Sequence, residues 1–376
     1  MAQWNKTTQD FLNQERSLFE VFNVATSDGL QVTENNPLPV TGIVTQGNID
    51  AFGRNRVSIP LTLFDSSHRF ADNNLWSTAT VTGGSTSFNA SQGLVDLTVT
   101  TAANAEVVRE TTKVFSYQPG KSLLVMSTFV PATPQTNLRQ RIGYYGASNG
   151  MYYQLDGLTP AFVERSLVTG SVTETLISQT GGVYGAGDTG WNGDKLDGTG
   201  PSGLTLSKDK AQILWMDIEW LGLGSVRMGF VIDGQFIICH TFHHANRMLS
   251  TYITTASLPL RYEIKNTGVT AGGTLKQVCS TVISEGGYEL RGLQQAVGTP
   301  ILSPSNLDDK GIYYPLISLK LKTTRLDAVV ILTALSILGL GDSTYNWQVI
   351  ASGSTTGGTW VSAGTDSSVE YNITPA

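Results

Sequence analysis

The amino-acid sequence predicts an all-β protein, in which a large β-sandwich follows an N-terminal helical arm and precedes a small C-terminal β domain. Short runs of alternating apolar and polar residues recur along most of the chain, separated by Gly-rich, Asn-Gly and Asp-Gly breaks. The 376 residues include 40 glycines, which implies many turns, and exceed the usual size of one domain. Only 14% are charged, against ~25% in typical soluble domains, so uncharged polar side chains must cover the surface.

The first 24 residues are the one clear helical candidate. Apolar residues recur there every seven positions and widen into a stripe, while Gln, Asn, Glu and Arg fill the other face. The candidate assembly residues on this stripe are Trp4, Phe11, Leu18 and Phe22. We expect residues 1–42 to form a helical arm and an extended linker, which either associates as a three-stranded coiled coil or packs on its own domain.

Residues 43–297 are expected to form the sandwich. Its strongest local signals are two hairpins, one at Asp233-Gly234 and one at Asn149-Gly150, because these dipeptides accept the positive φ of tight hairpin turns. Many short strands at such spacing are typical of a β-sandwich or barrel.

A break in the periodicity at residues 298–311 predicts a linker, and residues 312–376 are expected to form a small β domain. The longest apolar run of the chain, residues 328–340, is too short to span a bilayer and predicts one or two buried strands. No membrane span and no signal peptide are expected.

The charge of the chain limits the partners that we expect, and its cysteine content indicates the compartment in which it is made. The net charge of −6, a pI near 5.3 and the lack of a Lys/Arg run argue against binding to nucleic acid. The two cysteines, Cys239 and Cys279, cannot form a disulfide framework, which suits a protein made in a reducing cytosol.

Two carboxylates raise the question of catalysis. In MDIEW, residues 216–220, Asp217 and Glu219 fall on one face of a predicted strand. The segment resembles the E-x-D-x-E strand of retaining β-glucanases, which need two carboxyl groups about 5 Å apart. Trp215 stands where one of the required glutamates would be, so we expect a solvated or hydrogen-bonded strand face, no catalytic residues and no enzyme.

No metal site or cofactor is expected. His240 and His244 would lie roughly 13 Å apart on a strand, too far to bind one ion together; a turn at His243-His244 would bring them closer, but the sequence offers no further ligands at compact spacing. The segment 194–203, DKLDGTGPSG, lacks the residue order of a calcium loop. There is no phosphate-binding glycine loop and no nucleophile elbow.

Aromatic residues offer a possible contact with a sugar or a partner protein. Trp191 lies within a long Gly-rich loop, residues 181–203, and Tyr145 and Tyr152 flank the Asn149-Gly150 hairpin. These three residues are the candidate contacts for a host surface glycan or a partner.

Two long blocks of the sequence resemble segments of virion structural proteins of tailed bacteriophages, especially those of marine and cyanobacterial phages. They are DAFGRNRVSIPLTLFDSSHRFADN, from Asp50, and WNGDKLDGTGPSGLTLSKDKAQILWMDIEWLGLGSVRMGFVIDG, from Trp191. YQPGK at residues 117–121 and the terminal SSVEYNI fit the same family, so the resemblance covers roughly residues 36–376. The VRMGFVIDG hairpin also looks like strands of concanavalin-like jelly rolls, which agrees with a jelly-roll or lectin-like sandwich.

The resemblance implies a virion component and supplies no catalytic residues. The sequence therefore predicts a non-enzymatic structural protein, assembled in the host cytoplasm onto the capsid or tail, with other virion proteins as partners. A homo-oligomer is expected, with a trimer as the first hypothesis. Two alternatives stay open: a receptor- or glycan-binding module of a tail fibre, and a glycan hydrolase. Whether the protein decorates the capsid or belongs to the connector, tail or fibre is not determined by the sequence.

Overall fold

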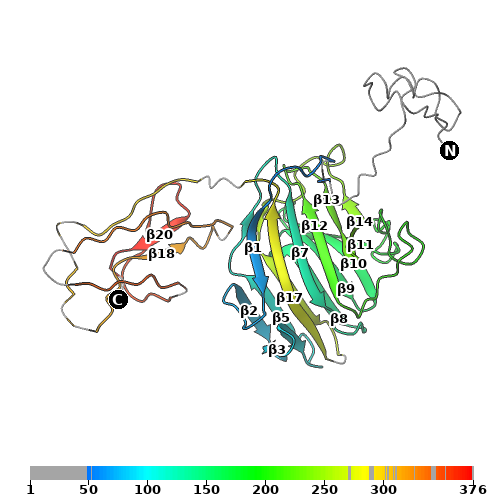
Figure 1. Cartoon of the computed structure of the whole chain (residues 1–376), viewed down its shortest axis with the longest axis horizontal. Coiled ribbons are helices and arrows are strands. Elements are labelled where there is room, and N and C mark those ends of the chain that lie inside the picture. The colour runs from blue at the N-terminus through cyan, green and yellow to red at the C-terminus, as the bar shows by residue number, and fades with distance from the viewer. Residues whose placement is uncertain are drawn as a thin grey trace, which may run out of the picture. The chain divides into compact units, whose positions relative to one another are not determined.

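The computed structural model describes residues 49–51, 53–269, 272–287, 292–300, 302, 305–307, 309, 311–325, 327–339, 344–351 and 353–374. These residues form β-strands, turns and extended segments (Figure 1). Among them there is no helix, and so none long and apolar enough to cross a membrane.

The predicted fold class therefore needs correction: the structure supports an all-β sandwich without the helical arm. The arm was assigned to residues 1–24 with Trp4, Phe11, Leu18 and Phe22, and the whole of it lies outside the described residues.

One sheet of the sandwich has eight antiparallel strands. Seven of them follow the order β14-β13-β12-β7-β17-β4-β3, and β1 pairs with β17. The long strand β17 pairs with β7 on one side, and on the other with β1 along its C-terminal half and β4 along its N-terminal part. The strands are β1 (Leu61–Ser67), β3 (Gly84–Asn89), β4 (Leu94–Val99), β7 (Leu123–Val130), β12 (Gln212–Ile218), β13 (Val226–Ile232), β14 (Gln235–Phe242) and β17 (Gly273–Ser284).

The second sheet has seven antiparallel strands in the order β11-β10-β9-β8-β16-β5-β2. Its members are β2 (Trp76–Val81), β5 (Glu106–Thr111), β8 (Leu138–Tyr145), β9 (Gly150–Asp156), β10 (Thr159–Ser166), β11 (Thr173–Ser178) and β16 (Leu260–Asn266). A short pair joins β6 (Phe115–Ser116) and β15 (Ser257–Leu258). The chain passes repeatedly from one sheet to the other, as in a jelly-roll-like sandwich.

A single apolar core joins the two sheets, because inward-facing residues of both contribute to one cluster. Phe230 on β13 meets Tyr153 on β9, with ring centroids 5.3 Å apart, and Phe162 on β10 at 6.1 Å. Along β7 buried and half-buried residues alternate strictly, as expected for a strand with one face on the core.

The hairpin predicted at Asp233-Gly234 is confirmed. Ile232 pairs with Gln235, and the two turn residues have φ of 49° and 75°, as the two-residue hairpin turn requires. The hairpin predicted at Asn149-Gly150 is present between β8 and β9, but Gly150 belongs to β9 and pairs with Tyr145. The loop is therefore longer than a two-residue turn.

The C-terminal part contains a three-stranded sheet in the order β18-β20-β19, built from β18 (Ser318–Leu321), β19 (Val361–Ser362) and β20 (Val369–Asn372). The prediction of buried strands in the apolar run 328–340 is wrong for the described residues 328–339. They form no strand, and several of their large apolar side chains are exposed. An apolar, β-prone segment needs a partner strand to be buried, and the described part of this chain supplies none to this run.

Replacing Gly234 by Ala should lower the free energy of unfolding by about 1–2 kcal/mol, because a Cβ disfavours the left-handed backbone that Gly234 adopts. Gly187→Ala is the matched control, since Gly187 does not have a positive φ and a Cβ there would meet no atom within 4 Å. Urea unfolding of both variants measures the difference. Equal losses would show that the turn conformation does not limit stability.

Candidate functional site

Strand β12 places two carboxylates on the outer face of the eight-stranded sheet, away from the core. Leu214 and Met216 point into the core, whereas Trp215 and Asp217 point outward, and Glu219 follows directly after the strand. Asp217 and Glu219 share one face, as predicted. Neither side chain is solvated, however, because both are completely buried.

Asp217 is neutralised by two guanidinium groups. Its Oδ2 lies 2.5 Å from Nη2 of Arg227, on the neighbouring strand β13, and 2.7 Å from Nη2 of Arg56. Arg56 also reaches Glu285, just after β17, at 2.7 Å. A buried carboxylate is tolerated only when it is paired in this way, since desolvation without a partner is costly.

Arg56 belongs to residues 49–58, a segment that we term the strap. Residue 52 within it lies outside the described residues. A tight turn closes the strap on itself. Asp50 accepts hydrogen bonds from the backbone N–H of Arg54 at 2.8 Å and from its Nε at 2.6 Å. Arg227 anchors the start of the strap by donating to the carbonyl of Ile49 at 2.5 Å.

Glu219 lies beneath the strap. Arg54 donates to its Oε1 at 3.3 Å and to Oδ2 of Asp50 at 2.6 Å, so one guanidinium group bridges the two carboxyl groups. Burial raises the pKa of Glu219 to about 8, and the charges of Asp50 and Asp217 add to the increase against the opposing effect of Arg54. Burial also acts to raise the pKa of Asp50, but hydrogen bonds from Arg54 and Glu219 outweigh it and lower that pKa. At neutral pH Glu219 is therefore protonated, whereas Asp50 is ionised.

This arrangement differs from that of a working pair of glycosidase carboxyl groups. A shallow pocket of about 240 Å³ lies beside the strap and is lined by residues that include Asp50, Arg54 and Glu285, but neither Asp217 nor Glu219 lines it. Asp217 is held by two arginines, and Trp215 occupies the position of the missing glutamate. In this conformation a substrate therefore cannot reach either residue.

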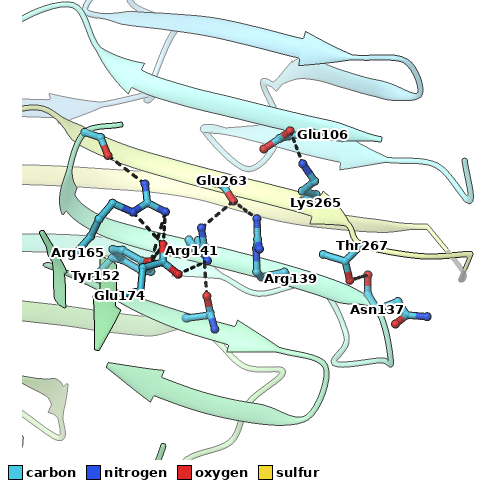
Figure 2. Close-up of polar contacts among 12 residues, drawn as sticks. Glu106, Asn137, Arg139, Arg141, Tyr152, Arg165, Glu174, Glu263, Lys265 and Thr267 are labelled. Atoms are coloured by element: carbon cyan, nitrogen blue, oxygen red, sulfur yellow. Dashed lines mark hydrogen bonds and ion pairs between the residues drawn. The ribbon is translucent and has the colours of Figure 1, made fainter. Parts of the chain in front are cut away.

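A second polar cluster covers the outer face of the seven-stranded sheet (Figure 2). Glu174 on β11 lies 2.6 Å from Arg165 and 3.3 Å from Arg141, and Glu263 on β16 lies 3.0 Å from Arg139. Burial acts to raise the pKa of Glu174, but Arg141 and the hydrogen bonds of Tyr152 and Arg165 lower it below the ordinary value. Arg165 and Glu174 pair across the neighbouring strands β10 and β11, whereas Arg141 reaches from β8 to Glu174 on β11.

Tyr145 and Tyr152, two of the candidate glycan contacts, lie under this grid and are completely buried. Their rings pack against each other at 4.4 Å, and Arg165 lies over both rings at 5.4 and 5.2 Å. The prediction that they offer exposed faces to a sugar is therefore wrong: the guanidinium groups occupy the faces on which a sugar would stack.

Trp191, the third candidate contact, is also buried. Its ring packs on Phe162 with centroids 4.7 Å apart, and its Nε1 donates to the carbonyl of Ile177 at 3.1 Å. The long loop folds inward because Asp188 accepts from the backbone N–H groups of Ser178 and Val183. Trp191 is thus a core residue that a loop carries into the sandwich, and it presents no surface to a ligand.

The histidines serve separate structural contacts. His240 Nδ1 accepts from the Asn192 N–H at 3.3 Å, and burial lowers its pKa to about 4. His244 lies 2.6 Å from Glu164 and stacks on Tyr252 at 3.9 Å. No group of three His, Cys, Asp or Glu residues within the described ranges is arranged to hold a metal ion.

Asp194 opens the segment that was compared with a calcium loop. Its carboxylate accepts from the backbone N–H groups of Leu196 and Ser202, at 2.9 and 2.7 Å, so it shapes a turn.

Sequence reasoning missed Asp50, Arg54 and Arg56 as partners of the β12 carboxylates. They belong to the block that begins at Asp50, whereas Asp217 and Glu219 belong to the block that begins at Trp191. The one sequence signal for this pairing was the opposite charge of two short motifs. Arg-x-Arg lies in the block from Asp50, and Asp-x-Glu lies in the block from Trp191. Residues 165 positions apart cannot be paired from charge alone.

Comparison with known proteins gives no family assignment: no family model matches the chain, and no curated protein matches it. Solved structures that align with it include a Bacillus licheniformis β-glucanase (12% identity, TM-score 0.37, 58% of this chain and 96% of that chain). Another is the CBM2 module of the evolved Dit of Lactobacillus casei BL23 phage J-1 (7%, 0.39, 61% and 98%). A third is the carbohydrate recognition domain of Emp47p (11%, 0.34, 58% and 94%). These identities and TM-scores are too low to assign an activity.

Asp217→Asn should lower the free energy of unfolding by about 3 kcal/mol at pH 7, because it leaves two largely buried guanidinium groups without their shared carboxylate. Glu219→Gln is the matched control and should change it by less than about 1 kcal/mol, since a neutral amide replaces a carboxyl that is protonated at that pH. Guanidinium chloride would screen the pair, so the unfolding is measured in urea. Equal losses in both variants would contradict the assigned charge states.

Proposed function

We propose that this chain is a non-enzymatic structural protein of a tailed-phage particle that assembles as a homo-oligomer. The observation that carries the proposal is the exposed apolar surface of the C-terminal part. Large side chains with much of their surface exposed occur throughout the described residues 328–339 and 344–350, including Leu338 at 80%, Trp347 at 60% and Ile350 at 72%. Single exposed apolar residues are ordinary, but a concentration of them in one segment marks an interaction surface.

The backbone of this surface points to the same conclusion. The described residues 328–339 and 344–350 belong to no strand, so their N–H and C=O groups have no ladder partner in the described part of the chain. The neighbouring sheet ends in the edge strands β18 and β19. Unpaired apolar segments beside open sheet edges are templates for pairing with another chain.

A second copy of this chain is the partner that fits best. From Ala328 to Thr365 the only charged residue is Asp342, so two copies of the segment would meet with little repulsion. A copy also brings the apolar, β-prone side chains that the surface requires. A trimer remains the first hypothesis for the oligomeric state.

The virion assignment is supported by the resemblance of two blocks of this sequence to phage structural proteins. These blocks meet in space, since the strap of the first covers Asp217 and Glu219 of the second. Their charged residues hold the chain's own parts together, which favours a structural role over hydrolysis. The proposed structural role covers three positions in the particle: capsid decoration, a fibre and a tail component. We do not propose that Trp191, Tyr145 and Tyr152 recognise a glycan, because all three are buried.

The full chain should elute as a multiple of its 40.3 kDa mass in size-exclusion chromatography with light scattering. The variant Leu338→Asp, Ile350→Asp should be smaller, ideally a monomer, because each buried charge without a partner is costly. Leu158→Asp, at an exposed position in the turn between β9 and β10, is the control and should leave the mass unchanged. A wild-type monomer at tens of micromolar, or an unaffected double variant, would contradict assembly through this surface.

Purified particles of the phage that encodes this chain should contain it at a fixed copy number. Mass spectrometry of gradient-purified particles measures the ratio to the major capsid protein, and antibody labelling in the electron microscope gives its position. We expect labelling confined to one structural part of the particle. Recovery of the chain only in the soluble fraction of the lysate would exclude a virion role.

A further inference from the structure

Two neighbouring loops of the sandwich expose four large apolar side chains. The turn between β12 and β13 presents Leu221, at 52% exposure, and Leu223, at 40%. The loop that follows β14 presents Met248 and Leu249, and the rest of the chain gives Leu249 no cover at all. We term these four residues the apex. Single exposed apolar residues are ordinary, whereas four on adjoining loops mark an interaction surface.

Hydrogen bonds hold the two loops of the apex side by side. The N–H of Tyr252 donates to the carbonyl of Gly222 at 3.1 Å, and Nδ1 of His244 lies 2.6 Å from the carbonyl of Gly224. His244 is itself buried, where it contacts Glu164 at 2.6 Å and stacks on Tyr252. Buried side chains therefore support both loops, and the apex is a fixed part of the folded sandwich.

Leu221 has a backbone conformation that disfavours leucine. Its φ is 36°, in the left-handed region, which in turns is normally occupied by Gly, Asn or Asp. Its half-exposed side chain is not a member of the core cluster. This leucine therefore stabilises neither the turn nor the core. Backbone strain at an exposed position of this kind points to a binding role.

A third turn, residues 117–121, adjoins the loops of the apex. Tyr117 packs edge-on against Trp220 of the β12–β13 turn, with ring centroids 6.2 Å apart. The third turn carries the half-buried Lys121. Arg54, with half of its side chain exposed, donates to a backbone carbonyl of this turn at 3.2 Å. Two cations therefore lie beside the apolar side chains.

The charges that face solvent around the apex are positive. A third cation, Arg247, is exposed directly beside Met248. The acidic residues described in the elements around the apex are turned away from solvent: Asp50, Glu164, Asp217 and Glu219 are buried, and Glu285, at 14% exposure, is paired with Arg56. A chain of net charge −6 thus presents a locally positive surface around an apolar apex.

We propose that the apex inserts into the surface of an anionic phospholipid bilayer, where Arg54, Lys121 and Arg247 contact the headgroup phosphates. Apolar side chains on loops gain free energy when they leave water for the boundary of the acyl chains, and each nearby cation is attracted by the negative surface potential. The positive surroundings favour a negatively charged partner. The inference concerns the sandwich alone and does not rest on the proposed assembly through the C-terminal part.

Flotation with extruded vesicles tests the proposal on the full chain. One set of vesicles contains phosphatidylcholine alone, and the other contains equal parts of phosphatidylcholine and anionic phosphatidylglycerol. The wild type should float with the anionic vesicles and much less with the neutral ones. Arg247→Gln should weaken binding to the anionic vesicles about fivefold and leave binding to the neutral ones unchanged.

The variant Leu223→Asp, Leu249→Asp should lower the partition coefficient at least about tenfold, because carboxylates replace side chains that enter the bilayer. Leu249→Asp alone lies at a fully exposed position, should unfold at the wild-type urea concentration and should weaken binding several-fold. Leu158→Asp, also at an exposed apolar position, is the matched control and should bind as the wild type does.

The same comparison is made with Leu338→Asp, Ile350→Asp added to each protein, so that the exposed C-terminal side chains and any oligomer do not contribute. The apex substitutions should have the same effect there. A wild type that floats with neither set of vesicles, or equally with both, would overturn the proposal. So would apex variants that bind like the wild type. Loss of oligomer mass in the apex variants without vesicle binding by the wild type would assign the surface to a second copy instead.

Discussion

The alternation of side chains along β12 is the constraint on which the rest of this structure depends. One face of the strand places Leu214, Met216 and Ile218 in the core. The other face then has to place Trp215, Asp217 and, just beyond the strand, Glu219 on the outer surface of the sheet. Because Asp217 is covered, it needs cations, which Arg56 of the strap and Arg227 of β13 supply, and Arg54 of the strap reaches Glu219. A shift of β12 by one residue would bury the carboxylates in the core and expose the apolar side chains.

On the outer faces of both sheets, buried charged side chains are paired with opposite charges from the same chain. On the seven-stranded sheet, Arg, Glu and Tyr side chains pair across neighbouring strands and cover each other, as Figure 2 shows for Arg165 and Glu174. On the eight-stranded sheet, an additional segment of chain supplies the opposite charges. Both solutions satisfy buried charged groups within the molecule itself. They explain how a chain with so few charged residues can keep several of them out of solvent.

Much of the sandwich could be predicted from the sequence, because strand alternation and turn chemistry act locally. The Asp233-Gly234 turn is an example, since its backbone follows from two adjacent residues. The burial of Trp191, Tyr145 and Tyr152 could not be predicted, because it depends on arginines and a folded loop from distant positions. The Arg56–Asp217 pair could not be predicted for the same reason, because its two residues are far apart in the sequence. The apolar run 328–340 was interpreted as buried strands on its composition, but composition cannot show whether the chain itself provides a covering partner.

The triple pairing of β17 has a consequence for how the protein is made. This strand, residues 273–284, completes the ladders of β1, β4 and β7, which the ribosome produces some 150 to 220 residues earlier. Until β17 emerges, the half of the eight-stranded sheet that contains β1 and β4 lacks its connection to β7. Folding of the sandwich is thus dominated by contacts that are distant in sequence, which makes β-sheet proteins slow to fold. The incomplete edges of β4 and β7 would meanwhile be open to pairing with other nascent chains, so this sheet is protected only after β17 has left the ribosome.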